Sequence, residues 1–349
     1  MECHHIIYMH KFKLQYCSIL LFFLLLLGGM NSTGLIQKQF PHNIEEIEIS
    51  NYDDEFYFVQ ITDTHVMHKL FDSTEVSKKR LRSLLDQVCF FEKKPAFIVI
   101  TGDLTEWGGN KISGALNCLA FISCFYTKNS SLYADIEYSI PIFTTPGNHE
   151  YCYNRNLTNY YRFINPFDRY IVKYQNVTLF FMNSGPNEYK DQYHWIKQIN
   201  GAGLYDDDIK WLERTLETCN TPIKIVIMHH PAVNVRDSSN TMWDVLARNR
   251  VTFISLCEQY DVEVVLAGHT HTERVFDGNE TFYPVNTSLN CSMRPTLFVQ
   301  TDDCKQSVHY RNMSINGMDV WLEPCVEVNF GDIDVGVPIT FQQFFMERR

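Results

Sequence analysis

Basic residues are scarce in this chain of 349 residues, which has 30 Lys and Arg against 41 Asp and Glu and a formal net charge of −11. An excess of negative charge disfavours binding to nucleic acid and to anionic membranes, so we expect no nucleic-acid partner. Any phosphate that the protein handles must then be met by metal ions rather than by a basic surface. A Cys-x-x-Cys motif is also missing, which argues against a zinc ribbon and a thioredoxin-type site.

Long apolar runs are absent beyond the N-terminal region. The one there, Ile19–Leu27, follows a short basic segment and precedes a polar one, the order of a secretory signal peptide. We therefore predict a signal peptide over residues 1–29 and a polar lead-in over 30–54. An uncleaved signal anchor is the alternative, because residues 14–30 approach the length of a membrane span. Only an uncleaved anchor would hold the protein at a membrane.

Eight Asn-x-Ser/Thr sequons favour export as well. They begin at Asn31, Asn129, Asn156, Asn176, Asn279, Asn286, Asn290 and Asn312. Together with the leader they predict a glycoprotein with N-glycans on surface loops, either secreted or in an endomembrane or lysosomal lumen.

The chain has eleven cysteines, of which nine remain if the leader is removed, so at least one would be unpaired. An oxidising compartment predicts disulfide bonds, which we expect among Cys291, Cys304 and Cys325 and between Cys118 and Cys124. The connectivity stays open.

Five short polar motifs follow runs of apolar residues. The motifs are Asp63-Thr64-His65, Gly102-Asp103, Gly147-Asn148-His149-Glu150, His229-His230-Pro231 and Gly268-His269-Thr270-His271. The runs before them predict buried strands at 56–61, 96–100, 140–143, 223–228 and 262–266. Because open α/β sheets place their sites at the carboxyl ends of strands, we expect the motifs to meet at one edge.

Helices with one apolar face are predicted between these strands, at 74–94, 206–219 and 251–260. Further strands are predicted at 170–174, 177–182, 296–300, 308–312 and 320–322. This alternation indicates an α/β protein. We predict a catalytic domain over 55–285, with the strands of 286–349 completing a second sheet before a tail.

The motifs carry metal-binding chemistry. Asp63 and His65 are two residues apart, as are His269 and His271, so while the backbone is extended each pair projects to one side. The two oxygens of Asp103 could reach two ions. A mixture of carboxylate, amide oxygen and imidazole suits Zn, Mn or Fe better than Ca or Mg.

Asn148, His229 and His269 could complete a second ion beside the first. Two ions about 4 Å apart activate a water near neutral pH and stabilise charge on phosphoryl oxygens. His149, next to Asn148, could give a proton to the leaving group. Glu150 or another nearby carboxylate could orient His149 from behind.

As an ordered set, the motifs resemble those of the calcineurin-like metallophosphoesterase superfamily over about residues 56–275. The resemblance implies a four-layer α/β/β/α sandwich of two mixed sheets, with a dinuclear metal site at the strand carboxyl ends. It assigns the first metal to Asp63, His65, Asp103 and His271. It assigns the second to Asp103, Asn148, His229 and His269, with His149 as the catalytic histidine and His230 outside the ligand set.

Within the superfamily, the segment from Asn183 to Glu213 resembles the phosphodiesterase branch. We therefore predict hydrolysis of a small-molecule or lipid phosphodiester by a metal-bound hydroxide, with His149 assisting the leaving group. One alternative is a secreted acid phosphatase acting on monoesters, although the tyrosine-ligand pattern of purple acid phosphatases is missing. Another is a non-catalytic scaffold with this fold, which should have lost ligands that are all present here.

Overall fold

The computed structural model of the protein describes residues 46–49, 55–125, 140–153, 156–185, 203–234 and 245–328. These residues belong to one compact unit, Ile44–Arg349. The predicted signal peptide and most of the lead-in lie outside them. Within the described ranges, no helix has the length and apolar character needed to cross a membrane.

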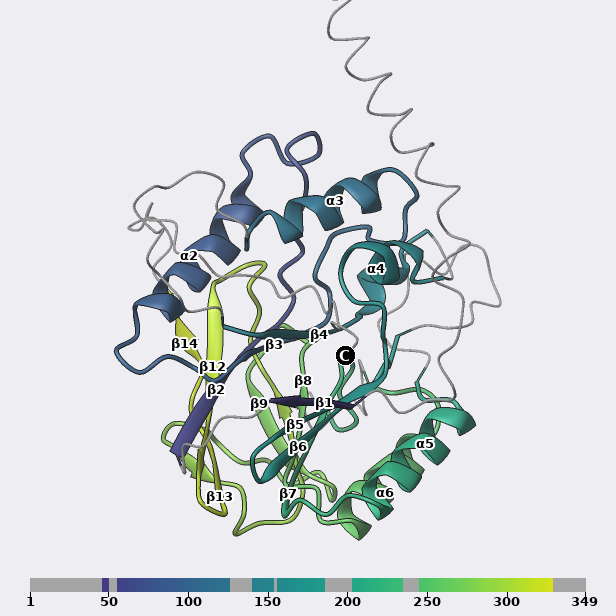
Figure 1. The fold of residues 1–349 in the computed structure, drawn as a ribbon, viewed down its shortest axis with the longest axis vertical. Coiled ribbons are helices and arrows are strands. Elements are labelled where there is room, and N and C mark those ends of the chain that lie inside the picture. The colour runs from purple at the N-terminus through teal and green to yellow at the C-terminus, as the bar shows by residue number, and fades with distance from the viewer. Residues whose placement is uncertain are drawn as a thin grey trace, which may run out of the picture. The chain divides into compact units, whose positions relative to one another are not determined.

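Two mixed sheets form the centre of this unit (Figure 1). The strand order of the first is β1 (Glu46–Ile49), β5 (Tyr170–Tyr174), β6 (Val177–Phe181), β7 (Ile223–Ile227), β8 (Val264–Ala267), β11 (Leu297–Gln300) and β9 (Arg274–Asp277). That of the second is β10 (Leu289–Asn290), β13 (Asp319–Leu322), β12 (His309–Asn316), β2 (Glu55–Ile61), β3 (Ile98–Thr101) and β4 (Ile142–Thr145), with β14 (Val326–Glu327) paired to β12.

The strands that precede the polar motifs run parallel within each sheet. β2, β3 and β4 are parallel neighbours, and so are β7 and β8. Parallel strands end at the same edge, which brings their carboxyl-terminal loops together. β12, antiparallel to β2, and β9, antiparallel to β11, make both sheets mixed.

Side-chain alternation along the strands divides the core between the layers. Phe58 of β2 belongs to the cluster that fills the space between the sheets, which also takes Val99, Leu179 and Ile225. Its neighbour Val59 points to the opposite face and packs with helix residues. Each sheet is thus apolar on both faces and must be covered on its outer side.

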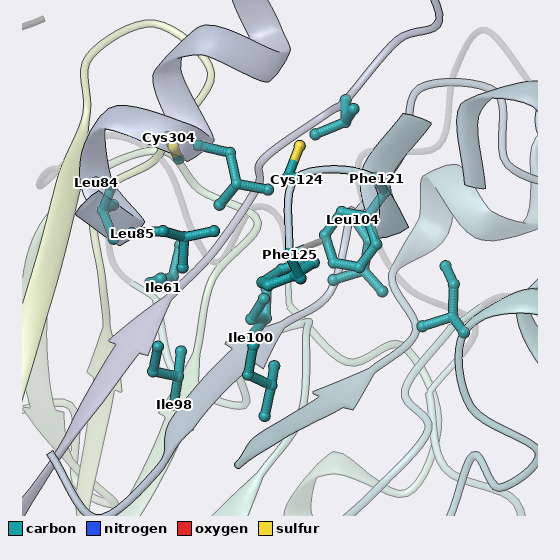
Figure 2. Packing of buried hydrophobic residues seen from close by; sticks show 14 of the residues in the cluster. Ile61, Leu84, Leu85, Ile98, Ile100, Leu104, Phe121, Cys124, Phe125 and Cys304 are labelled. Atoms are coloured by element: carbon teal, nitrogen blue, oxygen red, sulfur yellow. The ribbon is translucent and has the colours of Figure 1, made fainter. Parts of the chain in front are cut away.

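Helices supply that cover. On the second sheet lie α2 (Val76–Phe90), α3 (Ser113–Ile122) and α4 (Thr158–Phe163), and on the first lie α5 (Asp206–Glu217) and α6 (Arg250–Gln259) (Figure 1). Figure 2 shows Leu85 of α2 and Phe125 after α3 packed near Ile61 and Ile100 of the sheet. This arrangement confirms the predicted α/β/β/α sandwich.

The structure differs from the sequence interpretation in several elements, among them the strands β1, β9, β10 and β14, which had not been predicted. The C-terminal strands are divided between the sheets, because β11 pairs with β8 while β12 and β13 extend the sheet of β2. α3 and α4 had not been predicted; α3 is rich in small and apolar residues, so it lacks a charged face that would reveal a helical period.

Disulfide bonds are absent among the cysteines whose side chains are described, since all eight have free thiols. The predicted Cys118–Cys124 bridge is not formed. Cys118 lies within α3 and Cys124 just beyond its end, and six residues of helical chain turn the two side chains in different directions.

Candidate metal centre

All five motifs lie just beyond strand ends, as predicted. Asp63 and Asp103 each stand two residues after the last residue of β2 and β3. Asn148 and His149 open a short 3-10 turn, η3 (Asn148–Tyr151), that follows β4. His229 and His269 follow β7 and β8 in the same way.

The backbone at these ends is left-handed rather than extended. φ is 52° at Asp63, 42° at His65, 69° at His269 and 51° at His271. The prediction that each pair projects to one side of an extended chain was therefore wrong in its geometry, although the pairs do converge. Non-glycine residues in this conformation cost about 1–2 kcal/mol each, and such strain is typical of functional sites.

Asp63, His65 and His271 form the first cluster. Oδ1 of Asp63 lies 3.7 Å from Nε2 of His65 and 3.3 Å from Nε2 of His271. The other carboxylate oxygen, Oδ2, is engaged: it accepts hydrogen bonds from the Thr62 hydroxyl at 2.7 Å and the His269 backbone N–H at 2.8 Å. One oxygen of Asp63 therefore fixes the loop, and the other faces the imidazoles.

Asp103 joins the first cluster to the second through one oxygen. Its Oδ2 lies 3.6 Å from Nε2 of His65 and 3.4 Å from Nε2 of His229, while Oδ1 accepts the His149 backbone N–H at 2.7 Å. We had expected both oxygens to reach ions; the structure leaves Oδ2 as the atom available to both. Oδ1 of Asn148 completes this side at 3.0 Å from Nε2 of His229.

His269 is the remaining predicted ligand. Its ring centroid lies 5.0 Å from that of His229. The candidate ligand nitrogens of His229, His230 and His269 all lie within 4.8 Å of one another. The structure thus brings together all eight residues that were predicted for the site.

Three acceptors outside the clusters orient the imidazoles. Nδ1 of His229 donates to the Thr101 carbonyl at 2.8 Å, Nδ1 of His65 meets Glu106 Oε2 at 2.7 Å, and Nδ1 of His271 meets Asp303. A proton held on Nδ1 leaves the Nε2 lone pair free, which is the state that a metal ligand needs. Glu106 and Asp303 were missed by the sequence analysis. A carboxylate three residues after Asp103 could have drawn attention to Glu106, whereas nothing local indicates Asp303.

Two buried polar atoms of the site lack hydrogen-bond partners in the described chain, and their positions suit metal ligands. Oδ1 of Asp63 and Nε2 of His65 are buried and accept or donate no hydrogen bond within the described chain. Two ligands of a tetrahedral ion with bonds of about 2.1 Å lie about 3.4 Å apart, close to the separations of 3.3–3.7 Å measured here. Leaving such buried polar atoms unpaired would be costly, so cations suit the site.

The charges of the metal-free site agree with this geometry. Burial acts to raise the pKa of Asp63 and Asp103, but the surrounding histidines outweigh it and hold both pKa values well below the usual range. Burial likewise opposes protonation of His229 and His271, yet the neighbouring carboxylates raise their pKa values to about 9 and about 10. Protons therefore occupy the places that cations would take.

His149 faces the clusters from the side that is partly open to solvent. Its Nε2 lies 3.9 Å from Asp103 Oδ2, and its Nδ1 lies 3.1 Å from Glu106 Oε1. Glu106 is thus the carboxylate behind His149. Glu150 has a different role: its two oxygens accept the backbone N–H groups of Thr105 and Gly147, which closes the loop around the 3-10 turn.

Two glycines of the motifs allow close approaches that no other residue would. A Cβ on Gly147 would lie 2.2 Å from Asp103 Oδ1, and one on Gly268 would lie 1.8 Å from the Thr62 hydroxyl and 2.6 Å from Asp63 Oδ2. Both positions hold a carboxylate in contact with backbone. Glycine is required there by space rather than by backbone angle.

Carboxylates, an amide oxygen and oriented imidazoles around two adjoining ion positions define a dinuclear metallohydrolase centre. The calcineurin-like phosphoesterase family model matches residues 56–273, and the chain belongs to this family of dinuclear metal-dependent phosphoesterases. No curated protein gives a significant sequence match.

Solved structures share the fold. One is a dimetal phosphatase from Danio rerio, 12% identical over 79% of this chain and 99% of that one, with a TM-score of 0.52. Another is the purple acid phosphatase PPD1 from seeds of yellow lupin (Lupinus luteus), 13% identical over 81% of this chain, with a TM-score of 0.53. The match covers 54% of the lupin chain, so this protein spans about half of its length.

Proposed function

We propose that the protein hydrolyses phosphodiesters at the metal centre, with His149 as proton donor to the leaving oxygen. The proposal depends on the close approach of carboxylate oxygens and imidazole Nε2 atoms, which lie 3.3–3.7 Å apart in Asp63, Asp103, His65, His229 and His271. Beside them lies the imidazole of His149, which is outside the predicted metal ligands. When bound, divalent or trivalent transition metals (Zn, Mn or Fe) supply Lewis-acid stabilisation of the phosphoryl oxygens and a nucleophilic water near neutral pH.

The chain's own residues position the reaction. Asp103 Oδ2 is shared by the two clusters, Asn148 Oδ1 lies beside His229 in the second, and His149 reaches Asp103 Oδ2 from the open side. With its Nδ1 turned to Glu106, His149 presents Nε2 toward the reacting group. A protonated Nε2 can pass its proton to the departing oxygen, which is general acid catalysis.

Charge supports a diester over a monoester. Among the residues that the structure describes, Lys305 is the basic side chain that contacts the site, and its Nζ is already paired with Glu106 Oε2 at 3.2 Å. A diester brings one negative charge and a monoester brings two, so a site with little free basic charge suits the diester better. The resemblance of the segment from Asn183 to Glu213 to the phosphodiesterase branch agrees, although residues 186–202 lie outside the described ranges.

Purified protein loaded with Zn, Mn or Fe should hydrolyse bis-p-nitrophenyl phosphate and lose this activity on chelation. Elemental analysis should show that Asp103→Asn has lost at least one ion. Its activity should fall by about 100-fold or more. A fully metallated protein that cleaves neither this diester nor a panel of nucleotide, glycerol and lipid diesters would refute the proposal and favour the scaffold alternative.

A phosphomonoesterase is the second candidate, supported by the names of the two phosphatases that share the fold. Turnover of p-nitrophenyl phosphate against the diester decides between them. A kcat/KM that is higher for the monoester would favour the phosphatase.

We further propose that the protein is exported and carries N-glycans. Asn156, Asn279 and Asn286, which begin three of the sequons, are exposed. Expression in a eukaryotic secretory host should give a product whose electrophoretic mobility rises on treatment with peptide N-glycosidase. Mobility that does not change would remove the glycan prediction, and N-terminal sequencing of the same product would test leader cleavage.

A further inference from the structure

One buried imidazole in the centre has no role in the metal assignment. His230 is fully buried, and its Nε2 has no hydrogen-bond partner within the described chain. It is one of the three histidines whose candidate ligand nitrogens lie within 4.8 Å of one another, and its ring centroid is 4.4 Å from that of His269. A buried polar atom at a reaction centre calls for a partner.

The hydrogen bonds of Ser184 decide which nitrogen of His230 carries the proton. The Ser184 hydroxyl oxygen accepts the backbone N–H of His229 at 3.2 Å and that of His230 at 2.9 Å. These two bonds use both of its lone pairs. Its single O–H is then left to donate, and the atom within reach is Nδ1 of His230, at 3.1 Å.

An imidazole that accepts at Nδ1 and is neutral must carry its proton on Nε2. His230 therefore differs from His65, His229 and His271, whose Nδ1 atoms face acceptors, so that Nε2 is the nitrogen left to take a cation or, without metal, a second proton. In this state Nε2 is a donor and not a metal ligand. The hydrogen bond from Ser184 therefore gives His230 the tautomer with its proton on Nε2. The three other histidines have Nε2 oriented as a metal ligand.

We propose that the Nε2–H of His230 is a hydrogen-bond donor to a phosphoryl oxygen of the substrate held at the metal centre. Among the described residues, Nε2 has no hydrogen-bond partner, as is true of Oδ1 of Asp63 and Nε2 of His65, so a group bound at the same centre would be its partner. An anionic oxygen is the acceptor that such a fixed donor stabilises most. The inference rests on the proposed function, because it assigns an additional contact of the same substrate.

The test uses inorganic phosphate as the probe and the metal-loaded protein. His230→Leu removes the donor at similar size, and His230→Gln places an amide N–H at a similar reach. Phosphate affinity is measured by calorimetry, and bound metal by elemental analysis. His309→Leu, a change of a partly buried histidine that pairs with Asp302 outside the described clusters, serves as the control.

If His230 is a donor, both variants retain two ions, His230→Leu binds phosphate about tenfold more weakly or worse, and His230→Gln recovers part of the loss. His309→Leu should bind phosphate as the wild type does. Loss of one ion from either His230 variant would show that the residue is a ligand and overturn the inference. Unchanged phosphate affinity in His230→Leu would overturn it as well.

Two further results keep the test independent of folding and of the proposed function. If His230→Leu does not fold, His230→Gln carries the decision: two ions and phosphate affinity within about threefold of the wild type support the donor, and a lost ion refutes it. Wild-type diester hydrolysis with a normal His230→Leu would leave the function standing and remove only this contact.

Discussion

Glu106 is the residue on which the metal site and the proton donor both depend. Its Oε2 lies 2.7 Å from Nδ1 of His65, and its Oε1 lies 3.1 Å from Nδ1 of His149. Burial opposes the charge of Glu106, but the two histidines lower its pKa below the usual range. The carboxylate therefore stays ionised and orients a predicted ligand and a predicted acid at once.

Glu106→Gln should keep the shape of this contact and remove its charge. Partners of this kind typically change activity 10–100-fold, so we expect kcat to fall by about that factor, with a smaller change in KM.

Steady-state kinetics of the metal-loaded variant measure the changes in kcat and KM separately. Glu280→Gln is the control, since Glu280 lies on the surface and pairs weakly with Arg250 at 3.5 Å. Wild-type kcat in Glu106→Gln would contradict the role given to the carboxylate.

At the scale of the elements, the loops that follow the strands approach one another so closely that there is no room for a Cβ at Gly268. Gly268→Ala would drive a Cβ into the Thr62 hydroxyl and Asp63 Oδ2, so the carboxylate must move away from the imidazoles. We expect the variant to bind fewer than two ions and to melt at a lower temperature. Elemental analysis and circular dichroism measure the two effects.

Gly317→Ala is the matched control for this glycine. Gly317 has a φ of +57° but no atom within 4 Å of an added Cβ. The change should cost about 1–2 kcal/mol of backbone strain and leave metal content intact. Equal metal loss in both variants would show that the loss does not depend on the clash with Asp63.

Strand β12 is tied to the loop that carries His271 by a buried cation. Arg311 is fully buried; its Nη2 donates to Glu273 Oε1 at 2.6 Å and its Nε donates to the Thr301 hydroxyl at 3.1 Å. Glu273 Oε1 also accepts the backbone N–H of Cys325 at 2.9 Å. Two segments far apart in sequence are joined at one carboxylate.

Arg311→Met should destabilise the protein by about 3–5 kcal/mol, because Glu273 keeps its charge in a half-buried place without its partner. The midpoint of urea unfolding measures the loss. Arg250→Met, which breaks the surface pair with Glu280, should cost less than about 1 kcal/mol. A comparable loss of stability in the two variants would show that the buried pair contributes no more than the surface pair.

At the scale of the whole molecule, the site links stability to pH and to metal. His229 and His271 have pKa values of about 9 and about 10 in the metal-free protein, against 6.5 for free histidine. Between these values the folded state binds more protons than the unfolded state, so stability decreases as pH rises. The contribution is complete below pH 6.5 and lost as pH passes through about 9 to 10.

Metal-free protein should therefore melt at progressively lower temperature as pH is raised from about 7 to 10. Metal affinity should increase over the same window, because each bound cation displaces protons from the imidazoles. Scanning calorimetry with and without chelator measures the first effect, and titration in two buffers of different ionisation enthalpy measures the released protons. A melting temperature that rises with pH in the metal-free protein would contradict the charge arrangement.

The sequence indicated most of the longer strands and the set of ligand candidates, while the layer order was implied by the resemblance to the superfamily. Apolar runs that end in Asp, Asn or His are local signals, and parallel strands of one sheet end at the same edge, so the motifs of each sheet were expected to meet. The apolar face predicted for the helix at 206–219 is buried in α5, where it includes Ile209, Leu212 and Leu216. These features depend on neighbours within a few residues, which a single sequence displays.

Only the tertiary structure decided which atoms face the ions. Asp303 reaches His271 across 32 positions, and Ser184 reaches His230 across 46, and no local pattern reports such distances. The left-handed backbone at Asp63 and His269 was likewise invisible, because its strain is sustained by packing and hydrogen bonds from other loops. Residue types give a site its candidate ligands, but the orientation of each ring depends on hydrogen bonds that form only when distant loops are folded together.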